Sequence, residues 1–125
     1  MKILYIRTND TISARQIFAQ RENELNMADI KKLLSDKIET RVPTKISRLA
    51  YIYIMFADKE GAKRPVNKIA TALVSKDTYD VRGDVVLART NHFGVGAKIY
   101  ALDDQEIEKV LERIFLVLGR KVEVK

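Results

Sequence analysis

The chain has 125 residues and 46% of them are hydrophobic, which is enough for one domain around a single core. Because it has no cysteine and no apolar run long enough to span a bilayer, disulfides, thiolate metal sites and a membrane-spanning helix are excluded, and we expect a cytoplasmic protein without a membrane partner. A formal net charge of +6 favours nucleic acid or acidic proteins as partners, and the 32% of charged residues is typical of thermophile compositions.

The N-terminal segment begins with a predicted strand. Residues Lys2–Thr8 alternate in part and end at the turn-forming pair Asn9-Asp10. Thr11–Glu24 then has a few apolar residues at helical spacing, which leaves a helix and a loose connection as alternatives.

A capped helix is predicted after residue 26. Asn26 is a suitable N-cap and Asp29 lies three positions later, as in a capping box. The apolar residues fall on one stripe, which we expect to pack on a sheet: Met27, Ile30, Leu33, Leu34 and Ile38.

The longest apolar segment, Leu49–Ala57, is the predicted centre of the sheet. It has β-forming residues on both alternating faces, so it should be covered on both sides. If the helices cover only one face, the other face must be buried elsewhere. We therefore predict a homodimer.

Two more elements are expected in the middle of the chain. A polar turn at Asp58–Gly61 precedes Val66–Val74, where helical spacing and an Asn67 cap predict a short helix, with a strand as the alternative. Tyr79–Thr90 predicts a second buried strand, with Gly83 near its start.

The C-terminal part carries the clearest helix signal. After a loop at Asn91–Gly96, Ala97–Ala101 is the expected returning strand of a hairpin. A helix then starts at Asp103, with Glu106 in the capping-box position, and ends at Gly119. Lys121–Val124 alternates as a closing edge strand.

Without regular alternation of strands and helices, these elements predict an α+β fold. We expect a mainly antiparallel or mixed sheet of four to six strands, with two main helices packed on one face. The whole chain, residues 1–125, is predicted to form a single domain.

From residue 28 onward, the order of signals resembles a small domain of unknown function found in accessory proteins of phages, prophages, plasmids and viruses. The resemblance spans about Ala28–Leu111 and depends most on the Pro65/Asn67 and Gly83/Asp84 pairs. It implies an accessory protein of a virus or other mobile element, and supplies no catalytic residue or cofactor.

The positive charges gather in the middle of the chain and suggest a binding surface. The segment from Arg41 to Lys68 contains seven positive residues and only two acids. A surface patch with this excess of positive charge would bind phosphates. We therefore predict a non-enzymatic protein that binds nucleic acid, or alternatively a host protein. The candidate contacts are Arg41, Lys45, Arg48, Lys63, Arg64 and Lys68. The loop residues His92 and Phe93 are candidate recognition residues.

Two other functions are weighed against binding. A small metal-dependent hydrolase or nuclease would use Asp80, Asp84 and His92, but the single histidine excludes a catalytic triad or a site with two histidines. An inhibitor that mimics nucleic acid would use the acids of Asp103–Glu108, although these acids also suit a helix N-terminus. We expect no catalytic residue, metal or cofactor.

Overall fold

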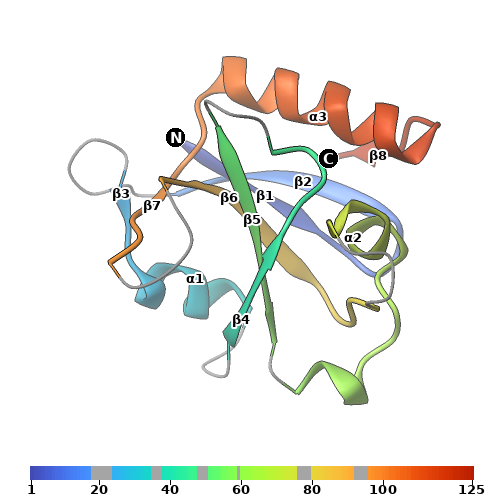
Figure 1. The fold of residues 1–125 in the computed structure, drawn as a ribbon, viewed down its shortest axis with the longest axis horizontal. Helices are drawn as coiled ribbons and strands as arrows, with labels where there is room; N and C mark the ends of the chain where they lie inside the picture. Colours follow the sequence, from blue (N-terminus) through green and yellow to red (C-terminus); the bar gives the residue numbers. More distant parts are fainter. Residues whose placement is uncertain (18–23, 35–37, 48–50, 59, 76–79, 92–95) are drawn as a thin grey trace.

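A computed structural model describes residues 1–17, 24–34, 38–47, 51–58, 60–75, 80–91 and 96–125 (Figure 1). Over these residues it has eight strands and three α-helices. None of these helices is long and apolar enough to cross a membrane. The strands are β1 (Lys2–Ile6), β2 (Thr11–Gln16), β3 (Glu24–Leu25), β4 (Ile38–Pro43), β5 (Ile52–Asp58), β6 (Val85–Thr90), β7 (Ile99–Tyr100) and β8 (Glu123–Val124). The helices are α1 (Met27–Leu33), the 3-10 turn η2 (Gly61–Lys63), α2 (Lys68–Leu73) and α3 (Asp104–Leu118).

All eight strands belong to one mixed, mostly antiparallel sheet. Its order is β3-β7-β6-β1-β2-β8, with β5 paired to β6 and β4 paired to β5. The pairing of β2 with β8 is parallel and the other strand pairings are antiparallel. The α+β class is thus confirmed, with more strands than predicted. The predicted central strand, β5, lies between β4 and β6, while β6 pairs with β1, β5 and β7.

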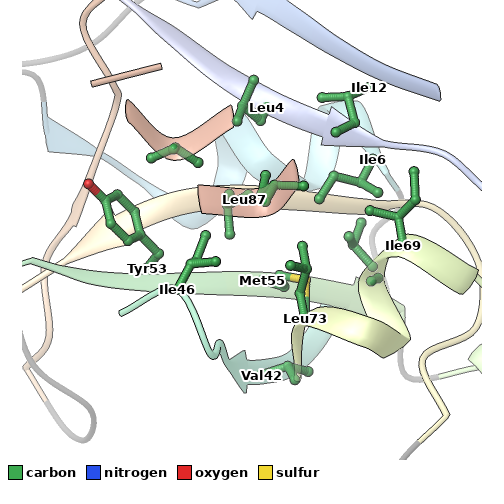
Figure 2. Close-up of a cluster of buried hydrophobic side chains, with 14 of the residues drawn as sticks. Leu4, Ile6, Ile12, Val42, Ile46, Tyr53, Met55, Ile69, Leu73 and Leu87 are labelled. Atoms are coloured by element: carbon green, nitrogen blue, oxygen red, sulfur yellow. The ribbon is translucent and has the colours of Figure 1, made fainter. Parts of the chain in front are cut away.

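The sheet is covered on both faces. Alternate residues of β5 enter two different clusters: Tyr53, Met55 and Ala57 lie in one, and Ile54 and Phe56 lie in the other. The first cluster packs under α2 and α3, and Figure 2 shows its side chains converging from the sheet and α2. The second packs under α1. The prediction of helices on one face is therefore wrong, because a strand that is apolar on both sides needs a cover on each.

This arrangement bears on the predicted homodimer. The dimer was inferred from an uncovered second face of the central strand, yet residues Tyr53–Ala57 are all buried within one chain. The homodimer stays a prediction, but the reason given for it no longer holds.

Two N-terminal elements differ from the expectation. The first part of Thr11–Glu24, left open between a helix and a connection, forms β2 as far as Gln16, paired along its length with β1. The helix after Asn26 has the predicted capping box but ends at Leu33, and Ile38 opposes Asp58 in the β4–β5 pair. Consequently α3 is the one long helix.

The short helix, the returning strand and the C-terminal helix agree with the prediction, whereas β3 and β4 were not predicted and β6 covers only Val85–Thr90 of the expected Tyr79–Thr90. Asn67 caps α2 by accepting from the Ala70 amide, and β7 returns alongside β6. Asp103 caps α3, and Gly119 ends it in the left-handed conformation with a φ of 70°. However, the Glu106 side chain accepts from Arg89 at 3.0 Å, so its carboxylate ties α3 to the sheet.

Candidate functional site

Four exposed cationic residues lie on two segments that contact each other: the segment from η2 to the start of α2, and the segment before β6. We call them the basic surface: Lys63, Arg64, Lys68 and Arg82. A bridge between Val66 and Arg82 joins the two segments, and the Arg82 guanidinium donates to the Arg64 carbonyl at 3.1 Å. The basic surface is therefore held by contacts between segments that are distant in sequence.

The backbone of Gly61 lies close to that of Arg82, which supports the contact between the two segments. A Cβ added at Gly61 would lie 3.2 Å from the Arg82 carbonyl oxygen, so a larger residue would push the two segments apart. The Gly83 amide also donates to the Pro65 carbonyl at 2.9 Å. The positions of the four charges thus depend on η2 lying tightly against residue 82.

The cations of the basic surface form no close ion pair among the described residues. Within the described part of the chain, none of the four forms an ion pair at 4.0 Å or less. The ion pairs found there lie elsewhere, at Lys2–Asp104, Arg89–Glu106 and Lys125–Glu123. Exposed cations without a partner are the groups that contact phosphates.

The other predicted contact residues are distributed differently. Lys45 is exposed but lies at the opposite end of α2, where its amide donates to the Leu73 carbonyl at 2.7 Å. Arg41 opposes Phe56 within β4, and nothing is described of its side chain. Arg48, His92 and Phe93 lie outside the described residues. Three predicted residues therefore belong to one segment, residues 63–68, and Arg82 contacts this segment through Val66 and Arg64.

A polar pocket opens beside the basic surface. It has a volume of about 240 Å³, and Arg64 belongs both to its wall and to the basic surface. Two carboxylates line it, Asp58 at the end of β5 and Asp84 before β6, together with the apolar side chains of Leu34 and Pro65. Sequence reasoning treated these two acids separately, since only strand pairing brings them together.

The Asp84 carboxylate is held by two donors. The Thr8 amide donates to Oδ1 at 2.8 Å, and the Tyr5 hydroxyl donates to Oδ2 at 3.3 Å. Burial raises the pKa of the Tyr5 hydroxyl above its usual value, and the neighbouring Asp84 charge raises this pKa further. Tyr5 therefore keeps its proton and remains a donor to Asp84.

The ring of Tyr5 is also enclosed by cations. The guanidinium carbons of Arg7 and Arg15 lie 4.9 and 4.6 Å from its centroid. Such contacts contribute about 0.5–1 kcal/mol at exposed sites and more when desolvated. They hold in place the tyrosine that positions Asp84.

The residues of the predicted hydrolase site are only partly gathered. Asp84 lines the pocket, whereas Asp80 is exposed and does not, and His92 lies outside the described residues. Among the residues that the structure describes, no group of three possible metal-ligating acids or histidines is found.

The acids at the start of α3 have structural partners. Asp103 accepts from the Glu106 amide, Asp104 pairs with Lys2, and Glu106 pairs with Arg89. Their predicted use as a nucleic-acid mimic would compete with these contacts.

No protein-family model, curated protein or solved structure matches this chain.

Proposed function

We propose that this protein acts by binding nucleic acid through the basic surface of Lys63, Arg64, Lys68 and Arg82, as a non-enzymatic accessory protein of a virus or other mobile element. The observation that supports the proposal most is that two contacting segments carry four exposed cations that form no ion pair among the described residues. Phosphate groups spaced along a strand can each approach one of them.

The charge pattern of the rest of the molecule supports the same interpretation. Asp103, Glu108 and Glu112 are exposed at the start and along the surface of α3, whereas the basic surface lies around η2 and α2. A polyanion would be repelled from the first region and attracted to the second, which orients the protein on its target.

Fluorescence anisotropy tests the proposal. Random single- and double-stranded DNA and RNA are titrated with the protein at about 50 and 200 mM salt. We expect binding that weakens steeply with salt. Neutralising the basic surface with K63Q, R64Q, K68Q and R82Q should lower the affinity at least about tenfold, and should reduce the slope of log affinity against log salt by about 3 for single strands.

A matched variant controls for net charge. K98Q, K109Q, R120Q and K121Q remove the same four charges from exposed positions elsewhere in the chain. Both quadruple variants lower the formal net charge of +6 by four, so only the position of the lost charges differs. Equal losses of affinity in the two variants would show that net charge alone attracts the nucleic acid and would contradict the proposed surface.

A second candidate function, binding to a host protein, is favoured by one observation. On α3, Leu116 is 74% exposed and Val117 is 39% exposed, beside a cavity that is also lined by Lys45 and Arg113. Exposed apolar side chains beside cations suit an acidic, partly apolar partner. A partner retained by the unmodified chain and by the basic-surface variant, but lost with L116D, would favour this function over nucleic-acid binding.

A further inference from the structure

The residues that line the pocket beside the basic surface suit a base rather than a phosphate. Arg64 lines the pocket as well as the basic surface, but two carboxylates, Asp58 and Asp84, line the pocket beside this single cation. A carboxylate repels phosphate oxygens but accepts hydrogen bonds from N–H groups. The pocket therefore selects a ligand part that carries N–H donors.

The Asp84 carboxylate is positioned for such a ligand. Each of its oxygens accepts one hydrogen bond inside the protein, from the Thr8 amide and the Tyr5 hydroxyl. Because a carboxylate oxygen has two lone pairs, both oxygens keep the capacity to accept one more bond. These two oxygens can receive two parallel donors from a single planar group.

Among the nucleobases, guanine offers this pair of donors. Its Watson–Crick edge presents N1–H and the N2 amino group side by side. Cytosine offers one amino group to a carboxylate, and uracil presents one N–H between two carbonyl oxygens that repel a carboxylate. A pocket of about 240 Å³ is smaller than the usual site for a drug-sized ligand, and Leu34 and Pro65 provide apolar wall for a flat ring. The pocket thus suits one base.

We propose that the Asp84 pocket receives one unpaired guanine from a single strand whose phosphates lie along the basic surface. This inference rests on the proposed function, because Arg64 connects the pocket to that surface. Single strands are the expected ligand, since an unstacked base exposes its Watson–Crick edge and a base within a duplex does not.

The test compares oligonucleotides of about 12 nucleotides that differ at one central position. Uridine or thymidine strands carry a central guanine, adenine, cytosine or no substitution, and binding is followed by anisotropy. We expect the guanine strands to bind about tenfold more tightly than the unsubstituted ones, in both RNA and DNA. Equal affinity for all four strands would overturn the inference, while salt-dependent binding of all four would leave the proposed function intact.

Two substitutions alter the pocket in different ways. D84N replaces one acceptor oxygen by a donor, and L34F fills apolar space while leaving Asp84 in place. Both should abolish the guanine preference, read as the ratio of the affinities for the guanine and unsubstituted strands within each variant, because D84N also removes a negative charge beside Arg64 and so strengthens the binding of every strand. Circular dichroism checks that each variant is folded. A guanine preference that survives in either folded variant would contradict the pocket.

A titration with guanosine monophosphate separates the two proposals. The Thr8 amide donates to Asp84, so its signal in a ¹H–¹⁵N NMR spectrum reports directly on this carboxylate. We expect guanosine monophosphate to shift the Thr8 signal and uridine monophosphate to leave it unchanged. A guanosine-specific shift without binding of any oligonucleotide would contradict the basic surface but support the pocket. The absence of any shift would contradict the pocket.

Discussion

At the scale of single residues, Asn67 joins three segments of the fold. The residue is fully buried. Its amide nitrogen donates to the carbonyls of Ile6 at 3.1 Å and Gly83 at 3.0 Å, while its Oδ1 accepts from the Ala70 amide. Asn67 thereby fixes α2 against the end of β1 and against the residue that precedes Asp84.

Replacing Asn67 by alanine should therefore lower the free energy of unfolding by more than the loss of a helix cap alone. Loss of the cap costs about 1 kcal/mol, and each of the two buried carbonyls left without its donor adds about 1 kcal/mol. We expect N67A to lower the free energy of unfolding by about 3 kcal/mol, measured by urea denaturation. The control is N26A, which removes the exposed cap of α1 and should cost about 1 kcal/mol. Equal losses in the two variants would show that the carbonyl contacts contribute nothing.

The same residues show what the sequence could predict about the site. The spacing within residues 63–68 was enough to group Lys63, Arg64 and Lys68, because they are neighbours in the chain. Arg82 was missed because its place depends on the Val66–Arg82 bridge, and no local pattern announces that pairing. The meeting of Asp58 and Asp84 likewise follows from the pairing of β5 with β6.

At the scale of elements, α3 is held in position by the buried side chains on one of its faces. Ile114 is fully buried in the cluster under α2 and α3, whereas Leu116 projects from the other side of the same helix. We expect I114A to lower the free energy of unfolding by about 2–5 kcal/mol, because it leaves a cavity between the helix and the sheet. L116A should change it by less than about 0.5 kcal/mol. Thermal or urea unfolding of the two variants compares them directly, and a large loss in L116A would mean that Leu116 is buried against a partner.

Elements defined by local signals were predicted well, and those defined by pairing were not. The capping residues Asp103 and Gly119 directly flank α3, so the sequence alone predicts where this helix begins and ends. By contrast, Thr11–Gln16 becomes a strand because it pairs with β1, against a sparse helical pattern. Ile38 continues the stripe of α1 in the sequence, but in the structure it opposes Asp58 in the sheet.

At the scale of the whole molecule, the sheet has one buried tyrosine in each of its two cores. Tyr5 lies in the cluster under α1, and Tyr53 lies in the cluster under α2 and α3. Burial is the main cause that raises the pKa of both hydroxyls, with Asp84 adding to the effect at Tyr5 and Glu106 adding to it at Tyr53. The stability of both cores therefore depends on pH in the alkaline range.

The direction of this dependence follows from proton binding. In the unfolded chain a tyrosine ionises near pH 10, whereas each folded hydroxyl with a raised pKa still holds its proton there. The stability from these groups is thus fully present below about pH 10 and is lost as the pH rises through the raised pKa values. Each tyrosine contributes a slope of at most about 1.4 kcal/mol per pH unit within this window.

Urea unfolding followed by circular dichroism between about pH 8 and pH 11 measures this loss. We expect the free energy of unfolding to fall less steeply above about pH 10 in the Y5F/Y53F double variant than in the unmodified chain, because neither phenylalanine ionises. Lysines titrate in the same window in both proteins, so the difference between the two curves isolates the tyrosines. The control is Y51F at a ring that is 45% exposed, which should keep the steeper decline. Parallel curves for the double variant and the unmodified chain would mean that neither buried hydroxyl links folding to pH.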